Sequence, residues 1–379
     1  MNQVDVSSLK QWVLNQQISI DVRSPGEFSQ GHLPGAINAP ILNDEERALI
    51  GKCYKDRGQE AAIALGHKIV SGDNKEAKLQ LWKELLGQHP EALLMCFRGG
   101  QRSQITQKWL QEVGLHRPLI QGGYKACRQF LLDFLNDYCT QNQFVVISGP
   151  TGSAKTHFLN DISGFWPVLD LEAYANHRGS AFGKMDQPQP QQAVFENQLL
   201  FSMLRNDHFE FPFAVEDESR MIGKSVQPDL FFATLRASPV ILLQVPIEQR
   251  TENTFYDYIL QTALAKPQSQ NHEGQIVFTK YKTALMNIQK KLGGLRTQQI
   301  MQMLEDSEKL WLENRNLESN KVWIQALLLD YYDPLYIGSF EKRQPQVLYK
   351  GSYQDAIRFL EEIKSKKREA PVKAKASRA

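Results

Sequence analysis

Cysteine is scarce in this chain. Its four cysteines, Cys53, Cys96, Cys127 and Cys139, include no pair with metal-ligand spacing. No apolar run approaches the length of a membrane-spanning helix, and no apolar N-terminal segment with a basic flank is present. We therefore expect a cytoplasmic protein without membrane contact or disulfides. Net charge is only +2, so any surface that binds nucleic acid must be local.

What the sequence does contain is enough material for two globular domains. The chain has 379 residues, of which 42% are hydrophobic and 23% are charged. Both fractions are ordinary for folded domains, and the length exceeds what one hydrophobic core usually serves.

One cysteine lies in a loop that is suited to bind an anion. Cys96 follows the apolar run 92–95 and precedes an amphipathic helical pattern over 104–113. At such a junction, backbone N–H groups and the helix dipole attract anions and stabilise a thiolate. The candidate anion ligands that accompany the nucleophile Cys96 are Arg98, Gly99, Gly100, Arg102 and Ser103. A buried structural thiol is the alternative, which the surrounding glycines and arginines disfavour.

The segments before this loop resemble the rhodanese family. The resemblance rests on Asp21-Val22-Arg23-Ser24-Pro25-Gly26-Glu27-Phe28, on Gly31-His32-Leu33-Pro34-Gly35-Ala36-Ile37-Asn38 and on the position of Cys96. It implies a rhodanese-like α/β domain over 1–138 in which the cysteine carries sulfur or a heavier chalcogen. Arg102 lies six residues after Cys96, one more than in many rhodaneses, which predicts a larger anion. Residues 41–90 are predicted to form a helical insertion, either two solvated helices or a partner-binding face.

A second anion loop follows the first domain. The β-branched run 144–148 leads into Gly149-Pro150-Thr151-Gly152-Ser153-Ala154-Lys155-Thr156, and a helical pattern comes next. This order of strand, loop and helix is the context that a P-loop requires. The candidate diphosphate ligands are Gly149, Gly152, Ser153, Lys155 and Thr156. Ala154 stands where P-loops usually have glycine, so ATP turnover is not the expected activity.

Further polar groups follow later strands of this α/β domain, which we place at 143–363. Thr156, Glu216 and Asp217 are candidate Mg²⁺ ligands, while acids at a helix start are the alternative interpretation of the last two. Asn176, His177, Arg178 and Ser180 form a candidate loop for a phosphorylated or RNA substrate. A long helical region from 255 to 313, with basic and aromatic residues, predicts an RNA-binding extension. Residues 364–379 form a basic tail with the composition of a disordered segment.

The combination of the two loops resembles the bacterial tRNA 2-selenouridine synthase family. The motifs are the Cys96 loop, the P-loop, Asn176-His177-Arg178-Gly179-Ser180 and Glu216-Asp217-Glu218-Ser219-Arg220. The resemblance implies conversion of wobble 2-thiouridine to 2-selenouridine through an S-geranyl intermediate, with geranyl diphosphate and selenophosphate as co-substrates. It assigns Cys96 as selenium acceptor and implies no tightly bound cofactor other than a candidate Mg²⁺. The implied partners are tRNA, small phosphorylated substrates and, as a candidate, selenophosphate synthase.

Two other classes of function stay open at this point. One is a rhodanese-type sulfurtransferase or phosphatase fused to a P-loop kinase, which ATPase or aryl-phosphatase activity would reveal. The other is a non-catalytic RNA-binding protein, in which Cys96 would be unreactive at neutral pH.

Overall fold

The computed structural model describes residues 2–185, 187–261 and 272–369. The chain forms two compact units. The first comprises Met1–Gln141, Gln189–Glu210 and Ser225–Phe231, and the second comprises Asn142–Pro188, Phe211–Lys224 and Phe232–Ala379. Two segments from the second half of the sequence therefore belong to the N-terminal unit, an arrangement that a single division near residue 140 does not anticipate.

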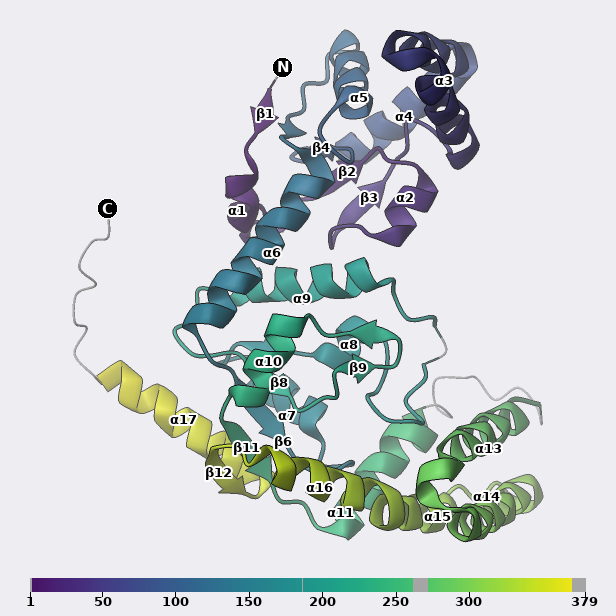
Figure 1. The fold of residues 1–379 in the computed structure, drawn as a ribbon, viewed down its shortest axis with the longest axis vertical. Helices are drawn as coiled ribbons and strands as arrows, with labels where there is room; N and C mark the ends of the chain where they lie inside the picture. Colours follow the sequence, from purple (N-terminus) through teal and green to yellow (C-terminus); the bar gives the residue numbers. More distant parts are fainter. Residues whose placement is uncertain (1, 186, 262–271, 370–379) are drawn as a thin grey trace. The chain divides into compact units, whose positions relative to one another are not determined.

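A parallel five-stranded sheet forms the centre of the N-terminal unit (Figure 1). Its order is β1 (Gln3–Val4), β5 (Leu119–Ile120), β4 (Leu93–Met95), β2 (Ser19–Asp21) and β3 (Ala36–Asn38). A short 3₁₀ turn, η1 (Val6–Ser8), precedes the first helix. The helices are α1 (Leu9–Leu14), α2 (Pro25–Gln30), α3 (Asp44–Ile69), α4 (Gly72–Gln88), α5 (Gln101–Glu112), α6 (Gly123–Gln141) and α9 (Gln192–Asn206). Parallel strands joined through helices, buried on the sheet, make this an α/β unit.

Local sequence explains why the helices start where they do. The α2 helix begins at Pro25 behind a capping box formed by Ser24 and Glu27. The α3 helix begins behind a second box formed by Asn43 and Glu46. These boxes satisfy backbone N–H groups that the first turn of a helix leaves without partners.

The predicted insertion divides into two helices of different character. The α3 helix is interrupted at Gly58 (φ 83°), and Ala62 is its one buried residue. The α4 helix instead packs into the core of the sheet. Trp82 is fully buried and donates its indole N–H to the carbonyl of Ala39 at 3.0 Å. The solvated helix of this region is therefore α3.

The second unit also has a parallel five-stranded sheet. Its order is β12 (Val347–Gly351), β11 (Val240–Leu243), β6 (Val145–Ser148), β8 (Ala214–Glu216) and β7 (Val168–Leu169). Strand β6 lies within the predicted run 144–148, but β12 was not anticipated from the sequence. Near residues 225–231, which belong to the N-terminal unit, the chain forms two short strands and a helix: β9 (Met221–Ile222), β10 (Ser225–Val226) and α10 (Asp229–Ala237).

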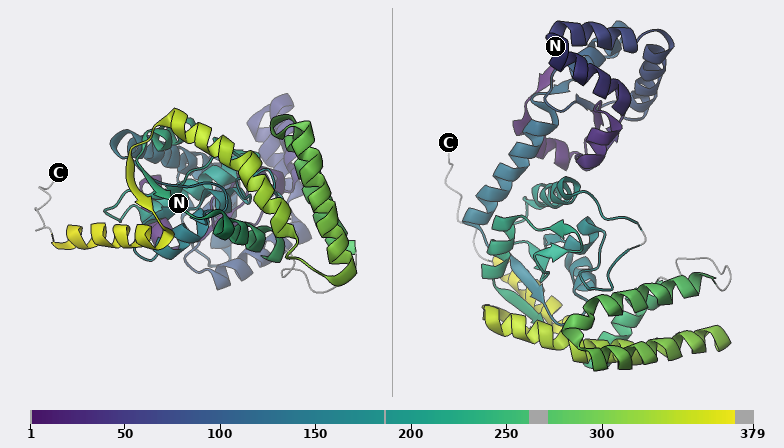
Figure 2. Two further views of the ribbon diagram at one scale, coloured as in Figure 1. Left: turned by 90° about the horizontal axis from the view of Figure 1, so that it is seen from below. Right: turned by 45° about the vertical axis from the view of Figure 1, so that its right-hand side comes forward.

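Helices complete the second unit. Around the sheet are α7 (Lys155–Ile162), α8 (Leu171–Ala175), α11 (Ile247–Phe255), the π-helical turn η2 (Tyr256–Leu260) and α17 (Tyr353–Glu369). The extension comprises α13 (His272–Leu292), α14 (Gly294–Asn314), α15 (Asn320–Leu327), the π-helical turn η3 (Leu328–Tyr332) and α16 (Asp333–Arg343). Helices α13 and α14 lie side by side (Figure 2), and the extension has its own apolar core around Tyr281, Leu285 and Trp323.

Two sequence expectations concern the C-terminal half of the chain. The basic tail was expected to be disordered from residue 364, but 364–369 continue α17, and 370–379 lie outside the described residues. In the extension that the sequence predicts to bind RNA, residues 262–271 also lie outside them. Among the described residues, no helix is long and apolar enough to cross a membrane.

Candidate active sites

The thiol of Cys96 lies where β4 ends and the loop to α5 begins. Cys96 is 3% exposed, and its sulfur lies 3.2 Å from the hydroxyl of Ser103 and 3.9 Å from the carbonyl oxygen of Gly100. Gly100 is the N-cap of α5 and supplies no side-chain cap. The first N–H groups of that helix therefore remain for an anion beside the thiol.

Two glycines allow the Cys96 loop to close on the neighbouring turn. Gly99 has a φ of 66° and Gly123 a φ of 59°, conformations that favour glycine. A Cβ on Gly123 would lie 2.2 Å from the carbonyl oxygen of Cys96. That oxygen accepts a hydrogen bond from the N–H of Tyr124 at 2.9 Å. The turn between β5 and α6 thus fixes the Cys96 loop through backbone contacts.

The two arginines of this loop differ in their surroundings. Arg102 forms a forked pair with Glu27, with N···O distances of 2.5 and 3.1 Å, while Arg98 is exposed. Arg47 also lies 2.9 Å from Glu27. Burial acts to raise the pKa of Glu27, but the hydrogen bond and charge of Arg102 outweigh it and lower that pKa. Arg98 is thus the available cation, and Arg102 would have to exchange Glu27 for a bound anion.

Other residues near Cys96 have structural partners. Asp21 binds Arg23, whose guanidinium lies 2.6 Å from the carboxylate and 4.1 Å from the ring centroid of Tyr124. The Nδ1 atom of His32 lies 3.1 Å from the backbone oxygen of Phe28. Burial raises the pKa of the Cys127 thiol to about 12, which makes it a poor nucleophile.

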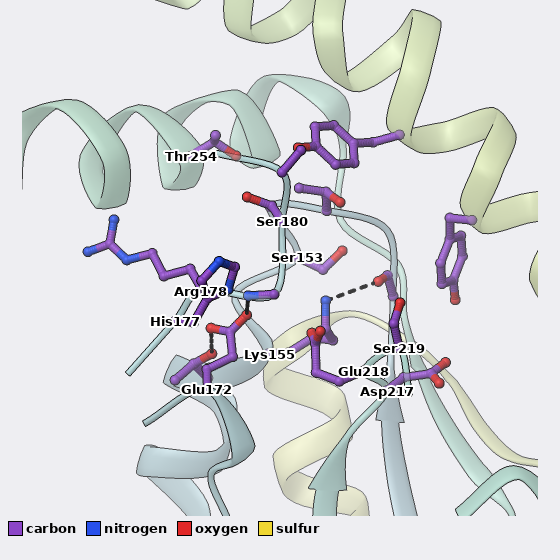
Figure 3. A pocket seen from close by; sticks show the side chains of 18 of the residues that line it. Ser153, Lys155, Glu172, His177, Arg178, Ser180, Asp217, Glu218, Ser219 and Thr254 are labelled. Carbon is purple, nitrogen blue, oxygen red and sulfur yellow. Dashed lines mark hydrogen bonds between the residues drawn. The ribbon is translucent and has the colours of Figure 1, made fainter. Parts of the chain in front are cut away.

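The second anion loop connects β6 to α7. Its glycines fit tight surroundings: Gly152 has a φ of 83°, and a Cβ there would lie 2.6 Å from the backbone oxygen of Arg250. Lys155 begins α7, and its ammonium group lies 3.4 Å from the backbone oxygen of Gly149. The hydroxyl of Ser153 is buried without a hydrogen-bond partner. Figure 3 shows the Lys155 ammonium group near Glu218 and Ser219.

Ala154 adopts the left-handed conformation (φ 57°, ψ 38°) at the N-cap of α7. The loop therefore requires a positive φ at the position where the sequence substitutes alanine for glycine. Left-handed alanine costs roughly 1–2 kcal/mol because its Cβ crowds the backbone. The loop nevertheless adopts this geometry, and α7 begins immediately after it.

Acidic side chains surround the Lys155 end of α7. The hydroxyl of Thr156 donates to Glu216 at 2.7 Å and lies 3.3 Å from Glu172. Burial raises the pKa of both carboxyl groups, and Glu216 is further affected by the charge of Glu172. Burial followed by the charge of Glu172 raises the pKa of Glu218 to about 8. These acids lie in a region that favours cations.

Asp217 faces different partners from Thr156 and Glu216. It accepts hydrogen bonds from Ser148 and, at 2.7 Å, from Arg343 of α16, and Arg236 lies 3.8 Å away. The structure therefore brings Thr156 and Glu216 together and gives Asp217 two arginine neighbours.

The segment 176–183 folds over the second loop. Asn176 is left-handed (φ 46°) and ends α8, and Gly179 donates its N–H to Glu172 at 2.6 Å. Arg178 donates to Gln261 at 2.7 Å, and Ser180 lies 2.7 Å from the hydroxyl of Tyr258. Burial lowers the pKa of His177, and its Nδ1 atom is buried without a hydrogen-bond partner. The candidate substrate loop is thus held by Glu172 and by η2.

Most of the predicted site residues line one of two cavities. One of about 890 Å³ contains Cys96, Arg98, Gly100 and Arg102. One of about 1170 Å³ contains the following predicted residues: Gly149, Gly152, Ser153, Lys155, Thr156, Asn176, His177, Arg178, Ser180 and Asp217. Gly99 and Ser103 support the first cavity, and Glu216 supports the second through Thr156.

Sequence reasoning did not assign roles to several residues of the larger cavity. One of them is Glu172, which contacts both Thr156 and the candidate substrate loop. Tyr258, Tyr336 and Arg343 also line this cavity. They come from η2 and α16, far along the chain, and no local pattern marks them.

The donor set at the second loop fits a hard divalent cation. Among the residues that the structure describes, no group of three or more His, Cys, Asp or Glu side chains is placed to hold a metal ion. The oxygens of Thr156 and Glu216 are nevertheless adjacent, and Mg²⁺ commonly combines such protein oxygens with substrate phosphates and water.

Comparison with known proteins gives matches for both units. The family described as "Rhodanese-like domain" matches residues 5–129, and "tRNA 2-selenouridine synthase AAA domain" matches residues 142–367. The fold is thus a rhodanese-like α/β unit and a P-loop α/β unit with a helical extension, as predicted.

Relatives cover nearly the whole chain. A protein from Bdellovibrio bacteriovorus is 46% identical over 91% of this chain and 94% of its own length. One from Nitrosomonas europaea is 47% identical over 90% and 94%, and one from Shewanella sediminis is 37% identical over 96% and 99%. Each of the three is described as tRNA 2-selenouridine synthase.

Proposed function

The chain belongs to the tRNA 2-selenouridine synthase family, and we propose that it makes 2-selenouridine in tRNA in two steps, one at each anion loop. It is a tRNA-modifying transferase whose macromolecular substrate is tRNA. The observation that carries the two-site proposal is that the chain has two anion loops, each lining its own cavity, of which only one contains a cysteine.

The first proposed step is geranylation at the P-loop. The sulfur of wobble 2-thiouridine attacks the first carbon of geranyl diphosphate, a C–S bond forms, the C–O bond breaks and diphosphate leaves. Lys155 and the N–H groups of the loop stabilise the charge that develops on the diphosphate. Thr156 and Glu216 would hold Mg²⁺, which supplies further neutralisation of the leaving group. Asp217 is the less favoured ligand because Arg343 already occupies one of its oxygens.

The second proposed step is selenium transfer at the Cys96 loop. The N-terminus of α5 and Arg98 bind the phosphate part of selenophosphate. The Cys96 thiol attacks C2 and displaces geranylthiol, and the selenium of the donor then attacks C2 and displaces Cys96, so selenium keeps its oxidation level throughout. In the net reaction, a C2–Se bond replaces the C2–S bond, geranylthiol leaves, and water takes up the phosphate group of the donor. Selenophosphate synthase, as the source of that donor, is a proposed partner.

The test is mass spectrometry of nucleosides from tRNA incubated with the protein, geranyl diphosphate and selenophosphate. Wild type should yield 2-selenouridine, Cys96→Ala should accumulate the S-geranyl nucleoside, and Lys155→Ala should leave 2-thiouridine unchanged. Cys127→Ala and Lys309→Ala are matched controls, because Cys127 is a poor nucleophile and Lys309 is exposed on α14.

Failure of wild type to change 2-thiouridine would refute the proposed function. ATP hydrolysis or cleavage of aryl phosphates by the same preparation would then favour the phosphatase or kinase alternative. Binding of tRNA without any of these activities, together with an unreactive Cys96, would favour an RNA-binding protein.

A further inference from the structure

The cavity that contains Cys96 is lined by both polar and apolar residues. Arg98, Arg102 and Glu27 line it near the Cys96 loop, and Gln59 and His67 of α3 are further polar lining residues. We call its apolar lining the apolar end: Ile41, Leu42, Ile50, Ile63, Ile105 and Trp109, all of which except Ile63 belong to one hydrophobic cluster. A volume of about 890 Å³ is far more than a phosphate-sized anion fills, and an inorganic anion gains nothing from aliphatic walls.

The apolar end depends on the solvated helix α3. This helix has only one buried residue, Ala62, yet its residues Ile50 and Ile63 form a wall of the cavity. Gly58 interrupts the helix between them (φ 83°), so the two isoleucines lie on different helical segments that face one cavity. Ile105 and Trp109 of α5, the helix whose N-terminus lies beside Cys96, line the same cavity.

These surroundings fit a ligand that carries an uncharged chain next to an anion-reactive centre. We infer that the apolar end binds the geranyl chain of the S-geranyl intermediate while C2 of the nucleoside lies at Cys96. The inference rests on the two-step proposal above and adds a prenyl-binding site in the N-terminal unit. Binding of the leaving group explains why an alkylated sulfur is displaced here: the chain positions the C2–S bond against the selenium donor.

The size of the effect follows from apolar burial. Burial of about three methylene-sized groups of the chain gives roughly 50-fold tighter binding than an S-methyl group would have. The selenium step should therefore discriminate by the length of the S-alkyl group, and that discrimination should come from KM. An anion loop without a prenyl site would accept both substrates alike.

The experiment uses the full-length protein and synthetic anticodon-loop RNA that carries S-geranyl- or S-methyl-2-thiouridine, with selenophosphate as donor. Ile50→Trp fills the apolar end, and Leu49→Trp places the same side chain one residue earlier on α3, where Leu49 is 58% exposed and outside the cavity. Wild type and Leu49→Trp should show a KM for S-geranyl RNA at least about 50-fold below that for S-methyl RNA. In Ile50→Trp this preference should fall below about fivefold.

A second measurement separates the inference from the proposed function. Equilibrium binding of S-geranyl-2-thiouridine and 2-thiouridine nucleosides requires no turnover, and the same preference and the same loss in Ile50→Trp are expected. If wild type makes no 2-selenouridine but shows this binding, the two-step function fails and the prenyl site stands. If selenouridine forms with equal KM for both RNAs, or Ile50→Trp and Leu49→Trp behave alike in both assays, the prenyl site is refuted and the function stands.

Discussion

Replacing Ala154 with glycine should stabilise the second unit, although alanine-to-glycine changes in helices usually destabilise proteins. Ala154 is left-handed (φ 57°), and relief of that strain contributes roughly 1–2 kcal/mol. Glycine gives the unfolded chain more freedom, which opposes the gain by about 0.4–1 kcal/mol. The expected net change in the free energy of unfolding is therefore an increase of about 0.5–1 kcal/mol.

Ala233→Gly is the matched control. Ala233 is exposed within α10 and belongs to the same unit, so the same chemical change should lower the free energy of unfolding by about 1 kcal/mol. The cost in the unfolded chain is the same for both variants and cancels in their difference. That difference, about 1.5–2 kcal/mol, reports the backbone conformation at Ala154 alone.

The assay is urea unfolding of the full-length protein followed by pulsed hydrogen exchange and mass spectrometry of peptides within residues 142–188. These peptides report the second unit separately from the N-terminal unit. Equal destabilisation by the two substitutions would show that Ala154 is not strained, and the reasoning from its φ angle would be wrong.

Three further outcomes are expected. Gly123→Ala should lower the free energy of unfolding of the N-terminal unit in urea by more than about 2 kcal/mol, because φ is positive and the new Cβ meets the carbonyl of Cys96. Gly100→Ala is its control: φ is −94° and no atom lies near the new Cβ, so the change should be less than about 1 kcal/mol. Asp217→Ala leaves Arg343 buried without its partner and should cost about 3 kcal/mol in the second unit; no loss would contradict the ion pair. The pKa of Glu27 in the folded state lies below its ordinary value of 4.5, so the charged carboxylate stabilises the fold above pH 4.5, and this stabilisation is lost as the pH falls through the folded-state pKa. The difference in unfolding free energy between wild type and Glu27→Gln should therefore shrink over that range of pH. A difference that stays constant with pH would contradict the lowered pKa.

The sequence predicts the two anion loops well because each is defined by local chemistry. An apolar run, a glycine-containing turn and a helical pattern are adjacent in the chain, so strand, loop and helix could be assigned without tertiary information. The same reasoning explains why Gly58 marks a break in α3. It also explains why the sequence alone indicates an unusual residue at position 154, which the structure shows to be left-handed.

Features that depend on distant neighbours could not be predicted in this way. An acid after a strand is consistent with a metal ligand, and what separates Asp217 from Glu216 includes Arg343, a partner 126 residues further on. Strand β12 has mostly exposed residues at the sheet edge, so it carries no strong apolar pattern. The amphipathic pattern of α9 indicates that one face is buried but does not indicate which unit covers it.

The position of α9 in the sequence constrains the order in which the two units can fold during synthesis. Asn197 of this helix donates to the backbone oxygen of His32 at 2.7 Å and to the hydroxyl of Tyr124 at 3.2 Å, and α9 packs on α1, α2 and α6. When the ribosome has made residue 141, the N-terminal unit therefore still lacks a helix that it buries. It can be completed only after the strand, P-loop and first helix of the second unit have emerged, so the two units must fold in an interleaved order.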